Sequence, residues 1–240
     1  DGTGDDAGHV RAFELSSGSW SQMGADIDGE AAGDNFGVGV SMSSDGKRIA
    51  VGAENNDSWG QKIRKYVNDS ALEDYLGASV AISGDYAIAG TPGDDSGGAA
   101  YILVRSGGSQ TWTQHDKIEA SDEAAGDSFG ISVSISGDYA IVGAYGDGSY
   151  AGSAYIFIRS GTSWSQQAKL TASDAATNDN FGYRVSISGS YAIVGAYGDD
   201  SNKGSAYIFI RSGTSWSQQQ KLLATDGVAP DNFGISVSID

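Results

Sequence analysis

The chain has 240 residues, with 31 acidic and 14 basic side chains, and its formal net charge is −17. Such a surface repels phosphate backbones and anionic lipid head groups, so nucleic acid and membrane surfaces are disfavoured as partners and cations are favoured. The sequence has no cysteine, which excludes disulfides and thiolate metal sites, and no run of about 18 apolar residues that could insert into a membrane.

The first stretch of the chain begins in the middle of a repeating unit. Residues 8–14 align with the third strand of the later units, and Ser19–Gln22 aligns with their tryptophan-bearing fourth strand. No signal-peptide pattern precedes them, so either such a segment was removed or the sequence begins inside a longer protein. We therefore expect residues 1–35 to supply only the third and fourth strands of a unit.

The next unit, residues 36–74, is shorter than the later ones. Gln61–Val67 can serve as its third strand, but no tryptophan-bearing fourth strand follows before Tyr75. The third strand would expose a basic edge. This edge either guards against aggregation between sheets or contacts an acidic neighbour such as another copy of the protein; its residues are Lys62, Arg64 and Lys65.

Residues 129–180 and 181–230 carry the clearest form of the unit. The aromatic-glycine pair recurs every 52 residues from Phe129 to Phe181 to Phe233. After Phe129, apolar residues alternate with serines, as in a strand with one buried face, and a Gly-Asp turn leads into a second strand. A third strand that is apolar on both faces and a more polar fourth strand follow. Each unit is therefore predicted to be a four-stranded antiparallel meander.

A single sheet of this kind cannot bury both of its faces, so the units must pack on one another. Radial packing of four-stranded sheets gives a β-propeller, and we predict an all-β fold with one such domain. Five blades are expected, one of them shared by the two ends of the chain. The predicted blades are residues 36–74, 75–128, 129–180 and 181–230, and the shared blade is 1–35 with 231–240.

The shared blade has no counterpart of the second strand. Either that blade has three strands, or the missing strand comes from another chain, or residues are missing from the sequence. Two further units outside this chain would raise the number of blades to about seven.

The recurring marks resemble those of the FG-GAP repeat, familiar from the propeller of integrin α chains. The marks are Phe129–Gly130 with Val142–Ala144, and Phe181–Gly182 with Val194–Ala196. The short form resembles repeats of extracellular microbial and algal proteins, and it runs through nearly the whole chain. The resemblance implies a propeller at the cell surface or outside the cell. Integrin-type repeats also carry a calcium cage between strands one and two, but the turns here are too short to wrap a cation.

One other acidic loop is a candidate calcium site. Its carboxylates stand at positions 1, 3, 5 and 9, a spacing that lets alternate oxygens converge on a hard cation. These residues are Asp26, Asp28, Glu30 and Asp34.

An aspartate also precedes every aromatic-glycine pair. Because it recurs in each unit, we expect its carboxylate to accept backbone N–H groups of the turn. These residues are Asp34, Asp74, Asp127, Asp179 and Asp231.

No catalytic set is apparent in the sequence. The two histidines, His9 and His115, fall at non-equivalent positions, and the acidic pairs are neighbours in one loop instead of facing each other across a cleft. The recurring tryptophans are expected to pack between blades instead of stacking on sugars; they are Trp20, Trp112, Trp164 and Trp216.

The sequence therefore favours a non-enzymatic, extracellular structural or adhesive propeller, of the kind that could build a surface filament or sheath. The alternative is a calcium-assisted module that binds glycans or proteins. Expected partners are proteins, copies of the same chain, or glycans. The sequon Asn68–Ser70 is compatible with N-glycosylation.

Overall fold

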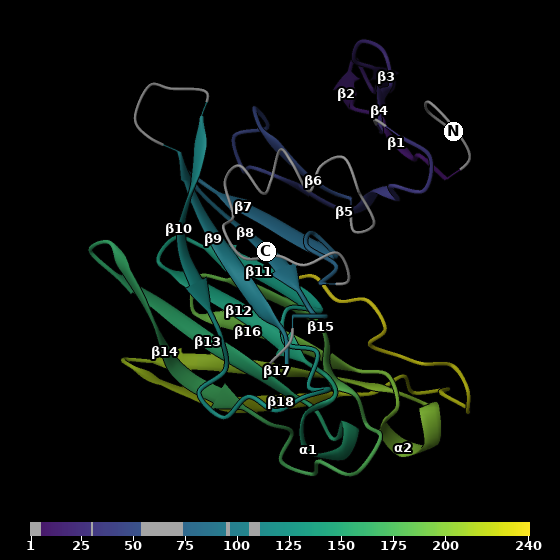
Figure 1. The fold of residues 1–240 in the computed structure, drawn as a ribbon. Helices are drawn as coiled ribbons and strands as arrows, with labels where there is room; N and C mark the ends of the chain where they lie inside the picture. Colours follow the sequence, from purple (N-terminus) through teal and green to yellow (C-terminus); the bar gives the residue numbers. More distant parts are fainter. Residues whose placement is uncertain (1–5, 30, 54–73, 95–96, 106–110) are drawn as a thin grey trace.

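The computed structural model describes residues 6–29, 31–53, 74–94, 97–105 and 111–240, and strands dominate it (Figure 1). Three four-stranded antiparallel sheets follow one another along the chain, each with its strands side by side in chain order. The first contains β7 (Ser79–Ser83), β8 (Tyr86–Thr91), β9 (Ala99–Arg105) and β10 (Trp112–Ile118). The second contains β11 (Ser132–Ser136), β12 (Tyr139–Ala144), β13 (Ser153–Ser160) and β14 (Ser163–Leu170). The third contains β15 (Phe181–Ser188), β16 (Tyr191–Ala196), β17 (Ser205–Ser212) and β18 (Ser215–Leu222).

These meanders confirm the predicted all-β fold of four-stranded blades. The turn between the first two strands is the expected two-residue hairpin, because Ser136 pairs with Tyr139 and Gly137 has a φ of 59°. A positive φ of this kind is the conformation that glycine adopts without steric cost.

The N-terminal part of the chain forms smaller sheets of two strands each. β1 (His9–Val10) pairs with β4 (Ile27–Asp28), and β2 (Phe13–Ser16) pairs with β3 (Ser19–Gln22). β5 (Phe36–Met42) pairs with β6 (Ile49–Ala53). The predicted third strand of this unit, the basic edge residues Lys62, Arg64 and Lys65, and the sequon Asn68–Ser70 lie outside the described residues.

The aromatic-glycine pairs that begin at Phe129, Phe181 and Phe233 dock on the loop that follows the second strand of the preceding sheet. The Phe129 N–H donates to the Gly97 carbonyl at 2.8 Å, and the Phe181 N–H donates to the Ala151 carbonyl at 3.1 Å. The Phe129 and Phe181 rings are fully buried. A β-carbon on Gly143 would lie 1.9 Å from the carbonyl oxygen of Gly182, so only glycine fits where consecutive sheets touch.

The serines of each first strand join that sheet to the next one. The Ser132 hydroxyl accepts the Val185 N–H at 3.0 Å, and the Ser134 hydroxyl accepts the Ile187 N–H at 3.2 Å. The serines thus replace solvent as partners of buried backbone groups, while the alternate apolar residues fill the cores between sheets.

The sheets do not close into a ring in this structure. Residues 233–240 lie against the third sheet, where the Ile239 N–H donates to the Ser186 hydroxyl at 3.2 Å. Within the described residues they pair with no strand of residues 8–22, and β1–β4 lie at the opposite end of the row from β15–β18 (Figure 1). The shared blade and the number of blades therefore stay predictions.

Candidate functional site

Two short turns follow the second strands of the last two sheets and lie on the same side of the molecule (Figure 1). They are α1 (Asp147–Tyr150) and α2 (Asp199–Asn202). Both contain consecutive residues with positive φ, which costs about 1–2 kcal/mol for each residue other than glycine. In α2 these residues are Asp200, Ser201 and Asn202, with φ of 50°, 62° and 69°. Contacts with neighbouring units must therefore hold the turns in place.

A lysine holds the carboxylates beside α1. The Lys169 Nζ lies 2.7 Å from Asp122 Oδ2 and 2.6 Å from Asp147 Oδ2, and it stands 5.4 Å from the centre of the buried Tyr155 ring. Burial alone would lower the pKa of Lys169, but the hydrogen bonds to the two carboxylates outweigh it and raise that pKa. The hydrogen bond from Lys169 lowers the pKa of Asp122. Lys169 is therefore protonated, and its ammonium group is the positive charge between Asp122 and Asp147.

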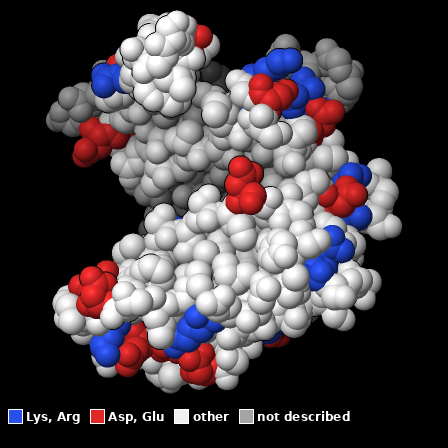
Figure 2. Space-filling view, turned by 180° about the vertical axis from the view of Figure 1, so that it is seen from behind, with Lys and Arg blue, Asp and Glu red and all other residues white. Residues whose placement is uncertain are grey.

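The next unit repeats this arrangement. The Lys221 Nζ lies 2.7 Å from Asp174 Oδ2 and 2.5 Å from Asp199 Oδ2, and it stands 5.4 Å from the centre of the Tyr207 ring. The Ser205 hydroxyl donates to Asp199. Small mixed groups of acidic and basic residues are also visible on the surface of the molecule (Figure 2).

Tyrosines from two units gather above these loops in what we call the tyrosine cluster: Tyr145, Tyr150, Tyr183 and Tyr197. The ring centres of Tyr145 and Tyr183 are 5.6 Å apart, and those of Tyr183 and Tyr197 are 4.7 Å apart, both edge to face. Tyr145 and Tyr150 are 5.9 Å apart. The Arg184 guanidinium lies 4.4 Å from the Tyr183 ring centre. Tyr150 is 48% exposed, and the other three rings are partly buried, so the cluster offers aromatic surface to a partner.

A polar cavity of about 560 Å³ opens beside α2. Asn178 and Asp179 line it from one loop, Asp199 to Asn202 from the other, and Lys221 from β18. Burial raises the pKa of Asp179. Carboxylate, amide, hydroxyl and ammonium groups therefore line one cavity. Tyr197 directly precedes the lining residue Gly198 in the sequence. Polar groups that converge on one space suit hydroxyl-rich or peptide ligands.

The sequence-predicted calcium residues are held in other ways. Arg11 binds Asp26 through two guanidinium nitrogens, with an Nη2–Oδ2 distance of 2.8 Å, and Gln22 donates to Asp26 at 2.7 Å. The hydrogen bonds from Arg11 and Gln22 lower the pKa of Asp26 to about 2. Asp28 lies in β4 opposite His9.

Of the other two members of the set, the structure describes Asp34. The buried Asp34 accepts the Ala31 N–H at 2.9 Å, and Glu30 lies outside the described residues. In the part of the chain that the structure describes, no three acidic or histidine side chains gather to hold a metal. Calcium binding at this loop stays a prediction, and it would require Asp26 to exchange Arg11 for the ion.

The aspartates before the aromatic-glycine pairs do what the sequence predicted. Each accepts the N–H of the residue three positions before it: Ala31 to Asp34, Ala124 to Asp127, Ala176 to Asp179 and Val228 to Asp231, at 2.7–2.9 Å. The corresponding donor for Asp74 lies outside the described residues. The carboxylates therefore shape the turns before the first strands.

The later tryptophans pack between sheets, as predicted. Trp164 is 7% exposed and packs edge to face on Tyr86 of the preceding sheet, with ring centres 6.1 Å apart. Trp216 packs in the same way on Tyr139, at 6.3 Å. Trp20 is 69% exposed, because it has no such ring beside it among the described residues.

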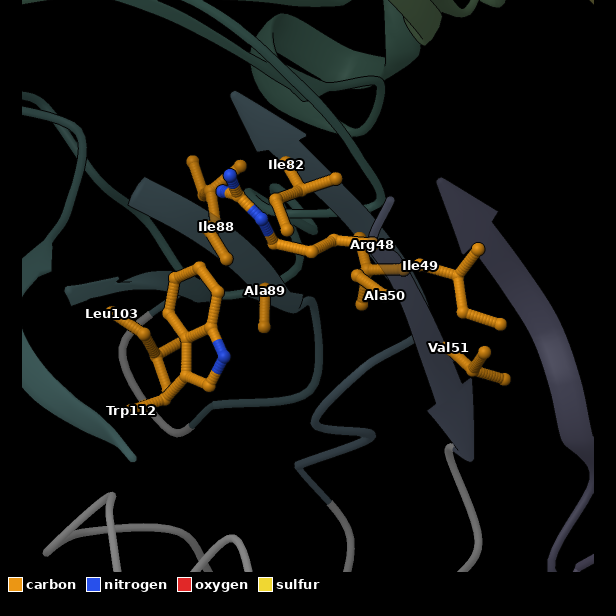
Figure 3. A pocket seen from close by; sticks show the side chains of 11 residues that line it. Arg48, Ile49, Ala50, Val51, Ile82, Ile88, Ala89, Leu103 and Trp112 are labelled. Atoms are coloured by element: carbon orange, nitrogen blue, oxygen red, sulfur yellow. The ribbon is translucent and has the colours of Figure 1, made fainter. Parts of the chain in front are cut away.

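An apolar cavity of about 290 Å³ lies between β6 and the first four-stranded sheet (Figure 3). Val51, Ile88, Leu103 and Trp112 help to line it, and among its described lining residues only Arg48 is charged. A ligand site needs several convergent polar groups to orient its ligand. We therefore regard the cavity as incomplete packing between two sheets and place the candidate site at the tyrosine cluster and the α1 and α2 turns.

Successive four-stranded meanders, joined by aromatic-glycine and glycine-alanine contacts, define a protein of the β-propeller type. A family model for the FG-GAP repeat matches residues 59–103, 112–157, 164–209 and 216–240. These matches cover more than half of the sequence, so the chain belongs to the FG-GAP repeat family. Repeats of this family indicate a protein-interaction module and are typical of extracellular proteins.

The other comparisons add little. No curated protein matched the sequence. One similar solved structure is that of Sqt1 from Saccharomyces cerevisiae, at 14% identity and a TM-score of 0.39, covering 60% of this chain and 33% of that one. A likeness this weak carries no argument here. Among the described residues, no helix is long and apolar enough to span a membrane.

Neither the tyrosine cluster nor the lysine-centred groups, which are Lys169 with Asp122 and Asp147 and Lys221 with Asp174 and Asp199, were predicted from the sequence. A signal for both was present: Tyr-Gly-Asp recurs at 145–147 and 197–199, and a lysine recurs at 169 and 221, all with the spacing of the repeat. The contacts of these residues could not be predicted from the repeat alone, because their partners lie in other strands and units.

Proposed function

We propose that this chain is a non-enzymatic, extracellular propeller segment that serves structural or adhesive contact, with the tyrosine cluster as its contact surface. The protein would act as a building block of a surface layer, filament or sheath. Its partners would be proteins, including copies of itself.

The observation that carries this proposal is the tyrosine cluster. Tyr145 and Tyr183 of two successive units pack edge to face with ring centres 5.6 Å apart, and Tyr150, tilted against Tyr145 at 5.9 Å, is 48% exposed. Aromatic rings that are held rigidly and partly exposed supply binding energy at a small cost in side-chain entropy, which is why they concentrate at contact surfaces. The lysine-centred groups support the surface, because they fix the loops on which it stands.

A glycan-binding module is the second candidate, with or without calcium. The polar cavity beside α2 favours it, because its carboxylates and amides could bind sugar hydroxyls while Tyr197 lies nearby in the sequence. Stacking of a sugar on a tyrosine ring would supply the apolar part of such a contact.

A bead assay and a glycan array test these two functions. Latex beads coated with the protein are expected to aggregate, and the double variant Tyr183→Ala and Tyr197→Ala should reduce aggregation at least fivefold. The matched control is Tyr75→Ala, a tyrosine 46% exposed ahead of β7 and outside the cluster. Equal aggregation by both variants would reject the tyrosine cluster as the contact surface. Specific signals on the glycan array, lost in the double variant, would favour the second function.

A further inference from the structure

Tyr183 is an exception to the repeat. The residue after the aromatic-glycine pair is isoleucine in the units on either side, at Ile131 and Ile235. Tyr145 and Tyr197, in contrast, occupy equivalent positions and belong to the repeat itself, since each directly follows the second strand of its sheet. The exception therefore adds one tyrosine to two that the repeated sequence supplies.

An irregularity in β15 sets the position of Tyr183. Phe181 pairs with Ala196, but the next pair in the register is Arg184 with Gly195, so Tyr183 has no Cα partner on β16. Bulges of this kind re-aim a side chain away from the regular alternation of a strand. The Tyr183 ring accordingly contacts tyrosine rings that follow two different second strands.

The separations between these rings are short. The ring centres of Tyr183 and Tyr197 are 4.7 Å apart, and those of Tyr145 and Tyr183 are 5.6 Å apart. Aromatic pairs in proteins usually stand about 4.5–7 Å apart, so the first pair is near the lower limit. Among the described residues, pairs of one tyrosine ring with another all belong to the tyrosine cluster. The other ring pairs join tyrosine to tryptophan, histidine or phenylalanine, or join two phenylalanines.

The covalent chemistry open to two phenols in contact is radical coupling. Loss of one electron and one proton converts a phenol to a phenoxyl radical, whose unpaired electron is shared by the ring carbons beside the C–O carbon. Two such radicals join through a bond between those carbons. Partners held in contact react far faster than partners that must meet by diffusion. The χ2 torsion of tyrosine is soft, so rings that meet edge to face can turn these carbons toward each other.

The rings of Tyr183 and Tyr197 are also within reach of an oxidant. Both are only partly buried, whereas Tyr155 and Tyr207 are fully buried and have a lysine ammonium over the ring. The chain has no cysteine, so no thiol competes for oxidation and no disulfide can join its strands. Oxidation of the chain is therefore directed toward tyrosine pairs of this kind.

We propose that Tyr183 and Tyr197 form an oxidative modification site, at which a dityrosine bond joins β15 to the loop after β16. The oxidant is hydrogen peroxide used by a haem peroxidase. Each phenol gives up one hydrogen atom, and the peroxide O–O bond breaks as hydrogen peroxide becomes two molecules of water. The two radicals form one C–C bond, and the hydrogen on each joined carbon then moves to the phenol oxygen of the same ring. The protein loses two hydrogen atoms in all.

The cross-link is a property separate from the contact function proposed above. It would tie the loop that carries α2 to the first strand of the third sheet by a covalent bond. Formation of this bond needs no partner protein, so it does not depend on what the tyrosine cluster contacts.

Treatment of the purified protein with hydrogen peroxide and a haem peroxidase tests the proposal. Monomers recovered after oxidation should show dityrosine fluorescence and an intact mass lower by two hydrogen atoms. Trypsin cleaves after Arg184 and so separates the two tyrosines. Tandem mass spectrometry of the digest should therefore find the peptide of Tyr183 joined to that of Tyr197. Protein treated with peroxide alone is the control for oxidation that does not pass through a tyrosyl radical.

Phenylalanine variants keep the ring and remove the reactive phenol. Tyr197→Phe should lower the yield of dityrosine within the chain by roughly fivefold or more, because the nearest partner of Tyr183 is lost. The matched control Tyr75→Phe, at a tyrosine 46% exposed outside the cluster, should leave that yield unchanged. An unchanged yield in Tyr197→Phe, a bond mapped to other tyrosines, or bonds that form only between chains would overturn the proposal.

The cross-link and the contact function can fail separately. Tyr197→Phe retains the aromatic surface, so beads coated with this variant should still aggregate although the cross-link is lost. Wild-type beads that do not aggregate would reject the contact function and leave the dityrosine result intact.

Discussion

Replacing Gly143 with alanine tests the contact on which the whole arrangement of sheets depends. The added β-carbon would lie 1.9 Å from the Gly182 carbonyl oxygen and 2.9 Å from its carbonyl carbon. Both obstructing atoms are backbone, so no side-chain rotation can relieve the overlap. To reach a separation of even 3.0 Å, the second and third sheets must move apart by about 1.1 Å at this point.

Such a displacement weakens two other interactions in the same contact. A gap of 0.5–1 Å already forfeits about a quarter to a half of the dispersion attraction between facing atoms. The bond from the Val185 N–H to the Ser132 hydroxyl, now 3.0 Å, would also stretch beyond hydrogen-bonding distance. Overpacking costs about 1–3 kcal/mol. A buried N–H without its acceptor costs about 1–3 kcal/mol more, so we expect Gly143→Ala to lower the free energy of unfolding by about 2–6 kcal/mol.

Urea unfolding followed by tryptophan fluorescence measures this change, because Trp164 lies between two sheets. The control is Gly137→Ala, where the new β-carbon meets no atom within 4 Å but the φ of 59° is unfavourable for alanine. That variant should lose only about 1–2 kcal/mol. If Gly143→Ala is no less stable than Gly137→Ala, close backbone contact is not the reason for glycine at this site.

Three further predictions follow from individual contacts. Ser132→Ala should lower the free energy of unfolding by about 1–3 kcal/mol in urea, since it removes the acceptor of a buried N–H; a loss below about 0.5 kcal/mol would contradict this. Lys221→Met should cost roughly 1–3 kcal/mol at pH 7. The hydrogen bond from Lys221 lowers the pKa of Asp174 below its ordinary value of 3.8. The stabilisation that the Lys221–Asp174 ion pair contributes is therefore present above pH 3.8 and is lost as the pH falls through the folded-state pKa of Asp174. Thermal melting should accordingly show a smaller cost of Lys221→Met at pH 3 than at pH 7. An equal cost at both pH values would argue against the ion pair. Arg11→Gln should strengthen any calcium binding at the 26–34 loop at least threefold in calorimetric titration, because it frees Asp26; identical titrations would reject competition between arginine and ion.

The sequence by itself determined the local architecture. The alternation after Phe129, the Gly-Asp turn at 137–138 and the 52-residue spacing fixed the strands, their order within a sheet and the need for sheets to pack. The role of the aspartate before each aromatic-glycine pair was also predictable, because its partner lies only three residues away. Short-range geometry of this kind depends on neighbouring residues, which a single sequence displays directly.

Only the tertiary structure decided which distant side chains share a site. Asp122 and Lys169 are 47 residues apart and lie in contact because two units pack together. The tyrosine cluster likewise needs rings from two units. The spacing of the 26–34 loop suited a cation, yet Arg11, 15 residues from Asp26, already binds that carboxylate. Long-range Coulomb and packing interactions depend on where the chain returns in space, and the spacing of residues along the sequence does not contain that information.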